Sequence, residues 1–254
     1  MKDEAAAGTR NGRWVVARQP PRARCRVLIF PPAGVGPQGV TGMVELLPAT
    51  VEALVLTLPG RDSPEVSTPR ATLTAVLSDT EETLAALPPL PTVALGCSVG
   101  ALLAVRVAEH LTPARVCGVV VAGQSPGALR RWPLHVTSDE DLLRVIDLAG
   151  GLPAAVLADA GLRRSIVDRL AADLRLGAEA EEGFAEVRLN TPLTVLAGLD
   201  DGLVPAHSMI GWPRHTTGPC RVLMLPGGHL AFLEARHSSL VRAVLRDSCA
   251  TLPG

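Results

Sequence analysis

The chain has 254 residues, of which 47% are hydrophobic, and its 24 basic and 25 acidic side chains give a formal net charge of −1. This length suits one substantial α/β domain with an insertion, and the balanced charge predicts no attraction to nucleic acid or to a membrane surface. The five cysteines form no Cys-x-x-Cys pair and no His/Cys cluster, so we expect neither a metal site nor a disulfide framework.

Residues 1–24 form a polar, Arg-studded leader whose one apolar group is Trp14-Val15-Val16. We expect this leader to be either a mobile segment or an edge strand. It lacks the apolar core of a signal peptide, and no stretch of the chain approaches the eighteen or so consecutive apolar residues of a membrane span. These patterns predict a soluble, cytoplasmic protein.

Residues 25–254 contain short apolar runs typical of buried strands, and helical patterns separate several of them. Such alternation is typical of an α/β fold with a mainly parallel sheet that helices cover on both faces. The strands are predicted over Val27–Phe30, Ala53–Leu58, Thr92–Leu95, Val116–Ala122, Leu193–Ala197 and Arg221–Leu225, and the helices over Ala71–Leu87, Ala101–Leu111 and Leu230–Arg246.

The pentapeptide Gly96-Cys97-Ser98-Val99-Gly100 lies between a predicted strand and a predicted helix. A sharp strand-to-helix turn around Gly-x-Ser-x-Gly is a nucleophile elbow, which exposes the serine hydroxyl at the top of a parallel sheet. A side chain at either glycine would collide as the strand and the helix approach each other. The motif predicts Ser98 as a nucleophile, and Cys97 is expected to point into the core.

The strand–helix alternation is interrupted at about 124–190. A helix start at Ser138 and apolar residues at helical spacing up to a stop at Gly177 predict two amphipathic helices. We expect them to form a lid over the site, the alternative being a helical pair packed permanently on the body. The side chains expected to line or cover the channel beneath are Leu142, Leu143, Ile146, Leu162, Ile166 and Leu170.

Two more strands end in groups that can activate a serine. One precedes Asp200 and Asp201, and the other precedes a glycine turn that ends in His229. Serine, then acid, then histidine is the chain order of α/β-hydrolases. His229 would take the proton of Ser98, and one of the two carboxylates would hold the histidine tautomer. The other carboxylate would cap the turn or face solvent.

An oxyanion hole needs two backbone N–H groups. Val99, directly after the nucleophile, supplies the first. The second is expected from the loop that follows Phe30, where two prolines have no N–H and leave Ala33 or Gly34 as the donor. The alternative interpretation of this loop is an ordinary Pro/Gly turn.

These motifs resemble the type II thioesterases that serve polyketide synthases and nonribosomal peptide synthetases, from about Val27 to about Leu233. The resemblance implies an α/β-hydrolase fold with its lid at 124–190, and it favours Ala33 as an oxyanion donor and Asp201, with Asp200 as the alternative, as the acid. Cys97, Pro32 and Val99 depart from the residues usual in that family. The matching segments are Phe30-Pro31-Pro32-Ala33-Gly34, Leu58-Pro59-Gly60-Arg61, the elbow, Ala172-Asp173, Gly198-x-x-Asp201-x-x-Val204-Pro205, Trp212, Thr217-Gly218 and Pro226-Gly227-Gly228-His229.

The resemblance implies a serine enzyme that hydrolyses acyl thioesters on the phosphopantetheine arm of carrier proteins, without a metal or redox cofactor. The alternatives are an acyltransferase or cyclase that uses the same acyl-serine, a small-molecule esterase, and a non-catalytic protein that binds carrier domains. Arg130 and Arg131, beside Trp132, either meet the acidic surface of a carrier domain or form a solvated pair.

Overall fold

The computed structural model describes residues 10–11, 13–61, 70–111, 113, 115–127 and 138–250. Its centre is an eight-stranded sheet in the order β1-β2-β4-β3-β5-β6-β7-β8, in which β4 to β8 pair in parallel. The strands are β1 (Arg10–Asn11), β2 (Trp14–Arg18), β3 (Cys25–Phe30), β4 (Val51–Leu56), β5 (Thr92–Cys97), β6 (Gly118–Ala122), β7 (Leu193–Gly198) and β8 (Cys220–Leu225).

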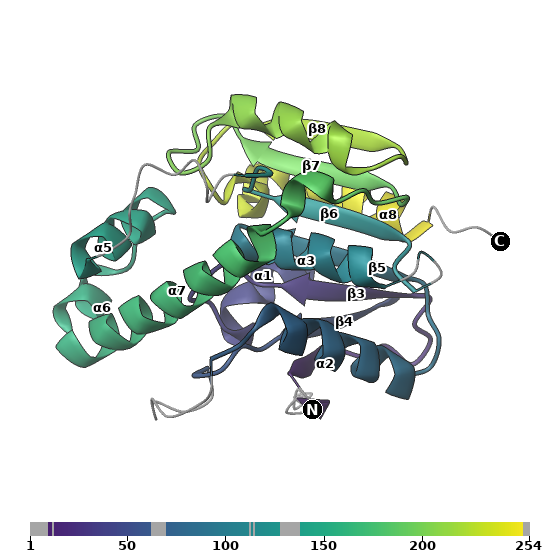
Figure 1. The fold of residues 1–254 in the computed structure, drawn as a ribbon, viewed down its shortest axis with the longest axis horizontal. Helices are drawn as coiled ribbons and strands as arrows, with labels where there is room; N and C mark the ends of the chain where they lie inside the picture. Colours follow the sequence, from purple (N-terminus) through teal and green to yellow (C-terminus); the bar gives the residue numbers. More distant parts are fainter. Residues whose placement is uncertain are drawn as a thin grey trace.

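Helices cover both faces of this sheet, with α2, α3 and α7 on one face and α1 and α8 on the other (Figure 1). No helix in the described segments is both long enough and apolar enough to cross a bilayer. The α-helices are α1 (Thr41–Leu46), α2 (Leu73–Ala86), α3 (Val99–His110), α5 (Asp139–Leu148), α6 (Ala154–Ala158), α7 (Ala160–Glu181) and α8 (Ser238–Ala250), and the 3-10 helices are η1 (Pro37–Val40), η2 (Phe184–Glu186), η3 (Ala206–His215), η4 (Ala231–Leu233) and η5 (Ala235–His237).

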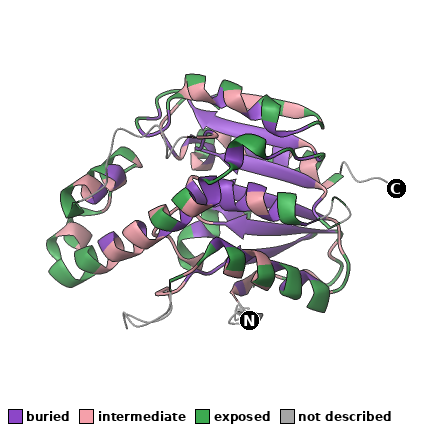
Figure 2. Cartoon of the chain, in the orientation of Figure 1, coloured by how far each residue is buried: buried purple, intermediate pink, exposed green. Residues whose placement is uncertain are grey.

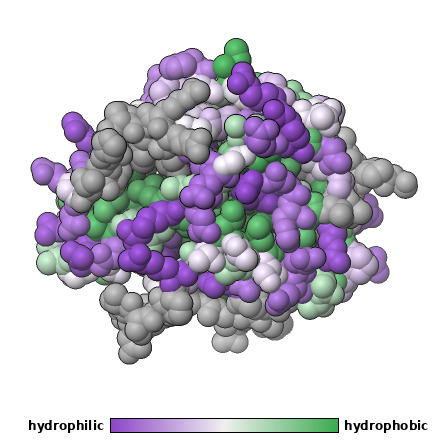
Figure 3. All heavy atoms as spheres, viewed as in Figure 1, coloured by the Kyte–Doolittle hydropathy of each residue, from purple (hydrophilic) through white to green (hydrophobic). Residues whose placement is uncertain are grey.

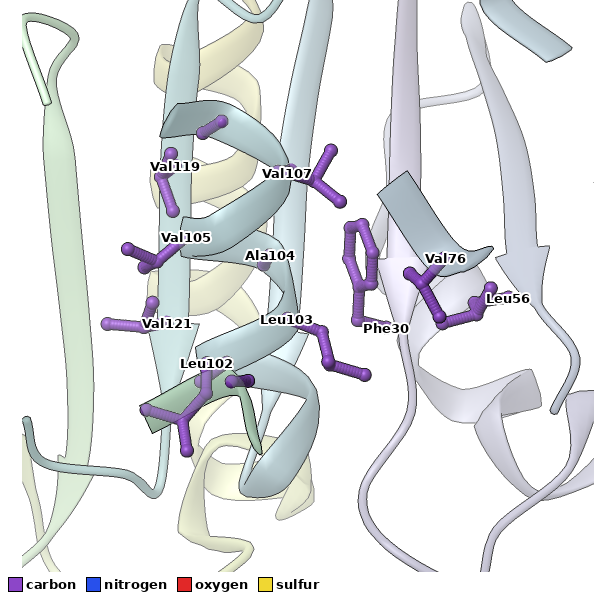
Figure 4. Close-up of a cluster of buried hydrophobic side chains, with 14 of the residues drawn as sticks. Phe30, Leu56, Val76, Leu102, Leu103, Ala104, Val105, Val107, Val119 and Val121 are labelled. Carbon is purple, nitrogen blue, oxygen red and sulfur yellow. The ribbon is translucent and has the colours of Figure 1, made fainter. Parts of the chain in front are cut away.

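The core forms because the central strands are apolar on both faces. In β3, Val27 and Ile29 pack toward α1 and α8, whereas Leu28 and Phe30 pack toward α2 and α3. Every residue of β3, β4, β5 and β7 is buried, which gives the continuous buried sheet of Figure 2. Figure 4 shows the α3 side chains lying between those of β6 and Phe30. Sheet and helix therefore hold each other at the point where β5 turns into α3.

Part of the leader is a strand of this sheet. β2 pairs antiparallel with β4, and β1 pairs with β2. Trp14 is fully buried and meets Phe30 edge to face, with ring centroids 5.2 Å apart. The strand interpretation therefore holds for this part of the leader, where β1 is the edge of the sheet and β2 lies between β1 and β4. Trp14 anchors β2 in the core.

The six predicted strands and the helices over α2 and α3 are present, but two helix boundaries were wrong. The predicted helix Leu230–Arg246 begins as the two short turns η4 and η5, and α8 itself starts only at Ser238. Gly177 does not end α7, because Leu176, Gly177 and Ala180 are all buried and the helix stays packed until Glu181. The short helix α6 was not predicted.

The insertion has an outer and an inner part. α5 and α6 extend from the body and expose much of their surface, whereas α7 runs back across α3 (Figures 1 and 2). The helix start predicted at Ser138 is present and has a capping box, in which the Ser138 hydroxyl accepts the N–H of Asp141 at 3.2 Å. Figure 3 shows hydrophobic surface between α5 and α7, beside the hydrophilic outer face of α7. The insertion therefore shelters an apolar space next to the top of the sheet.

Candidate active site

Ser98 occupies a strained turn between β5 and α3. Its φ of 53° and ψ of −127° lie outside the regions that residues with a side chain ordinarily adopt. The strain persists because the Ser98 N–H donates to the Ala122 carbonyl at 2.8 Å, and a side chain at Gly96 or Gly100 would collide with neighbouring backbone. Val99 is the first residue of α3, so its N–H has no acceptor within the helix. This is the geometry of a nucleophile elbow.

His229 follows β8 and lies against Asp201, which follows β7. The distance from His229 Nδ1 to Asp201 Oδ2 is 2.8 Å, and the two side chains are 2% and 0% exposed. The other oxygen of Asp201 accepts the N–H groups of Leu203 and Val204, at 2.8 and 3.0 Å. These bonds occupy both carboxylate oxygens and fix the plane of the group, which leaves Nε2 of His229 for proton transfer.

Asp200 lies differently from its neighbour. It is exposed, and its Oδ2 accepts the N–H of Gly227 at 3.2 Å, across the turn that leads to His229. Its own N–H donates to the Gly227 carbonyl at 2.9 Å. Asp200 therefore ties two turns together, and the carboxylate beside the imidazole is that of Asp201.

A cavity of about 300 Å³ joins these groups, since both Ser98 and His229 line it. Its walls come from the loop after β3, the elbow, the turn that follows Asp201 and the insertion. These walls are mostly apolar. Gln124 also lines the cavity, and its backbone carbonyl accepts the Trp212 Nε1–H at 2.8 Å. Such a site suits the acyl part of a substrate, because polar groups are few and stand next to Ser98.

Of the six lid side chains predicted to line or cover this cavity, three line it, namely Ile146, Ile166 and Leu170. Leu142, Leu143 and Leu162 do not, because each lies about one helical turn before the lining residues of its own helix. Leu142 is buried inside the insertion, Leu143 is half-buried and Leu162 is 50% exposed. The lid residues that line the cavity but were not among these six include Val145, Ala149, Leu152 and Leu174.

Both candidate donors in the loop after β3, Ala33 and Gly34, line the cavity, but one of them already has an acceptor. The Gly34 N–H donates to Asp173 Oδ2 of α7 at 2.7 Å. The Gly34 N–H is therefore occupied, which leaves Ala33 as the candidate donor of this loop.

Asp173 also forms an ion pair with Arg61, and the two side chains are 6% and 2% exposed. The other guanidinium arm of Arg61 donates to the Pro59 carbonyl at 2.9 Å. Burial raises the pKa of Asp173, while Arg61 and the Gly34 N–H act in the opposite direction. Sequence reasoning noted both residues only as parts of matching motifs. The contact joins segments 112 residues apart, so no local pattern could have revealed it.

The remaining candidate nucleophiles and bases lie elsewhere. Cys97 is fully buried, and burial together with the nearby Asp201 raises the pKa of its thiol, which disfavours the reactive thiolate. The other described histidines have surface or structural partners: His110 with Glu81, exposed His207, buried His215 with the Val187 carbonyl, and His237 with the Pro226 carbonyl. Within the described residues, no three His, Cys, Asp or Glu side chains form a group that could hold a metal ion.

Three residues from the sequence analysis lie outside the described residues. They are Arg130, Arg131 and Trp132. Both interpretations of the arginine pair, contact with a carrier domain or a solvated pair, therefore stay predictions.

The chain is similar to known thioesterases and to part of a longer synthetase, as two comparisons show. Residues 25–248 match the family model described as "Thioesterase domain". The chain is 31% identical over 251 residues to the AMB antimetabolite synthetase AmbE of Pseudomonas aeruginosa, and this match covers 95% of the chain but only 11% of that much longer protein. It is 29% identical over 245 residues to the probable cadicidin biosynthesis thioesterase of Streptomyces griseus, covering 94% of the chain and 68% of that protein.

The fold is shared with a solved thioesterase. RedJ, the thioesterase from the prodiginine biosynthetic pathway in Streptomyces coelicolor, superposes with a TM-score of 0.74 at 29% sequence identity. The match covers 91% of this chain and 94% of that one.

Proposed function

The chain belongs to the thioesterase domain family, and from this premise we propose that it is a serine thioesterase that hydrolyses acyl thioesters carried on the phosphopantetheine arm of carrier proteins. The observation that carries the proposal is the buried His229–Asp201 pair, whose histidine lines the same apolar cavity as the strained Ser98. Nucleophile, base and orienting acid follow each other in the order of α/β-hydrolases.

The first half of the proposed reaction forms an acyl-enzyme. His229 Nε2 takes the hydroxyl proton while Ser98 Oγ attacks the thioester carbonyl carbon. The N–H groups of Val99 and Ala33 stabilise the oxyanion that develops. The intermediate collapses by breaking the C–S bond, and His229 returns its proton to the departing sulfur, so the products are acyl-Ser98 and a free thiol. Throughout, Asp201 holds the Nδ1–H tautomer and stabilises the imidazolium.

The second half clears the serine. His229 takes a proton from water, the resulting hydroxide attacks the acyl-Ser98 carbonyl, and the returning proton restores the Ser98 hydroxyl as the acid leaves. The chemistry uses side chains and backbone N–H groups alone, so the proposal includes no metal or redox cofactor. The predicted cytoplasmic location stays a prediction.

Two features support a carrier-borne thioester. A thiolate leaves more readily than an alkoxide, so attack on the carbonyl is the difficult step, and the elbow and the oxyanion hole serve that step. The phosphopantetheine arm is roughly 20 Å long, comparable to six extended residues. It can therefore bring the thioester to Ser98 while a carrier domain stays outside the insertion.

The test is an intact-mass measurement of an acyl-loaded carrier protein, incubated with the chain or with Ser98→Ala. We expect the wild type to remove the acyl mass and restore the free thiol, and Ser98→Ala to leave the carrier loaded. A carrier that stays acylated with the wild type, or loses its acyl group equally fast with the variant, would contradict the proposal. An acyl group that appears on an added alcohol or amine would indicate the acyltransferase alternative.

The partner is tested separately, with the same acyl group on a truncated pantetheine thiol. Binding of the carrier domain remote from the reacting carbonyl should give the carrier substrate the higher kcat/KM. Equal values for the two substrates would remove the carrier protein from the proposal and leave a general thioesterase.

A further inference from the structure

We infer that Asp173 is a positioning residue of the oxyanion hole: held by Arg61, its carboxylate accepts the Gly34 N–H and so fixes the loop that presents Ala33. The inference rests on the proposed function for the reaction served. The contact itself is independent of that proposal, because it is a property of the described structure.

The contact joins three segments that are far apart in the sequence. Gly34 follows β3, Arg61 follows β4, and Asp173 lies in the middle of α7, which belongs to the insertion. The Gly34 N–H lies 2.7 Å from Asp173 Oδ2, and Arg61 Nη2 approaches the same oxygen. We call these three residues the loop clamp. Through it, a helix of the insertion holds the backbone next to the nucleophile.

The loop clamp decides which N–H groups are available to an oxyanion. A peptide unit is planar, so holding the Gly34 N–H fixes the plane that joins Ala33 to Gly34. This plane includes the Ala33 Cα, to which the Ala33 N–H group is directly bonded, so the clamp restricts the position of that donor. A hydrogen bond from N–H to a carboxylate is shorter and stronger than one between neutral groups. Without this acceptor the loop, which contains two prolines and two glycines in residues 31–36, would lose the side-chain bond that ties it to α7. Ala33 would then sample orientations that do not face the carbonyl.

A second carboxylate on the same helix provides a matched control. Glu179 Oε1 accepts the N–H of Leu73 at 3.0 Å and thereby ties α7 to the start of α2. Asp173 and Glu179 both fasten α7 to the body, but only Asp173 reaches the loop that lines the cavity. Docking of the helix is common to the two residues, so a difference between their variants isolates the effect on the loop.

The first experiment compares Asp173→Asn with Glu179→Gln in the full chain, after circular dichroism has established that each is folded. We expect Asp173→Asn to lower kcat by about 10–100-fold, less than the loss of an oxyanion donor, with KM within about threefold of wild type. Glu179→Gln should keep kcat within about threefold. Equal losses of kcat in both variants, or a change in KM alone for Asp173→Asn, would overturn the inference.

The second experiment uses the pH dependence of Arg61→Gln. Within the described part of the chain, Asp173 is faced by Arg61 and by Arg169, one turn earlier on α7, and both cations favour the ionised carboxylate. Burial already raises the pKa of Asp173, so removal of Arg61 raises it further. In Arg61→Gln, kcat should therefore recover with rising pH as Asp173 ionises. The double variant Arg61→Gln/Asp173→Asn should lack this additional step.

A contact that only stabilises the fold would not create a titration in kcat, so identical profiles for the single and the double variant would count against the clamp. Should Arg61→Gln not fold, Arg61→Lys keeps a cation but not the two-armed guanidinium, and a double-mutant cycle replaces the profile. The loss of kcat in the double variant Arg61→Lys/Asp173→Asn should be smaller than the product of the losses in the two single variants, because both act on the same contact. Independent, multiplicative losses would contradict the inference.

The loop clamp can be tested even if the proposed substrate is wrong. A fluorophosphonate reacts with an activated serine and places its phosphoryl oxygen in the oxyanion hole, without any thioester. Asp173→Asn should therefore label more slowly than Glu179→Gln at equal probe concentration. If the wild type labels but hydrolyses no acyl-carrier thioester, the proposed function fails while this comparison still decides the inference.

Discussion

Replacement of Asp201 by asparagine tests the candidate site at its most constrained point. The carboxylate accepts three hydrogen bonds, from the N–H groups of Leu203 and Val204 and from His229 Nδ1. Asparagine has one acceptor oxygen and one amide donor. If its oxygen keeps the two backbone bonds, its NH₂ faces Nδ1 and imposes the tautomer that carries the proton on Nε2. His229 can then no longer accept the proton of Ser98.

The opposite orientation of the amide is worse for the fold, because its NH₂ would face two N–H donors in a buried site. The amide therefore settles with its donor toward the imidazole. From this geometry we expect Asp201→Asn to lower kcat by about 10⁴-fold, equivalent to roughly 5.4 kcal/mol at about 1.36 kcal/mol per factor of ten. The free energy of unfolding should change little in comparison, because both backbone bonds persist.

Steady-state hydrolysis of an acyl-pantetheine thioester measures this loss, with Asp200→Asn as the matched control. Asp200 is exposed and accepts one bond of 3.2 Å, so its variant should retain kcat within about threefold. A larger loss for Asp200→Asn than for Asp201→Asn would refute the reasoning and transfer the acid role to Asp200.

Two other substitutions probe the elbow. Ser98→Ala should lower kcat by about 10⁴–10⁶-fold, whereas Cys97→Ala should retain most activity, and an inactive Cys97→Ala beside an active Ser98→Ala would reverse the two roles. Gly100→Ala should destabilise the chain by more than about 2 kcal/mol, because the added methyl group would meet the carbonyl oxygens of Phe30 and Pro31, and an unchanged midpoint of thermal unfolding would contradict this.

The parts of the fold that depend on local chemistry were predictable from sequence. The elbow, the strand before His229 and the start of α5 can each be identified from a pattern of about ten residues. This is possible because a turn, a cap or a buried strand restricts the residues that can form it. Apolar runs located the six main strands for the same reason. Each motif of this kind places one functional residue in the sequence. The parallel sheet then brings these residues together, because its strands end at the same edge.

What sequence reasoning missed depends on packing between distant segments. Gly177 is a typical helix stop, but α7 continues through it because the surrounding residues stay buried. The periodicity after Leu230 is apolar enough for a helix, yet the chain first makes the turns η4 and η5. The bond between Asp173 and Gly34 spans 139 residues, and nothing near either residue specifies the other. For Leu142 and Leu162, helical spacing identified the correct face but not the turn that reaches the cavity.

The central claim, that thioester hydrolysis proceeds through an acyl group on Ser98, is tested most directly by mass spectrometry of the chain itself. An acyl-pantetheine thioester is mixed with the wild type, the reaction is quenched within a turnover, and the protein is digested and sequenced by fragmentation. We expect the acyl mass on Ser98, transiently in the wild type and absent from Ser98→Ala. An acyl group on Cys97, or hydrolysis that continues in Ser98→Ala, would contradict the account.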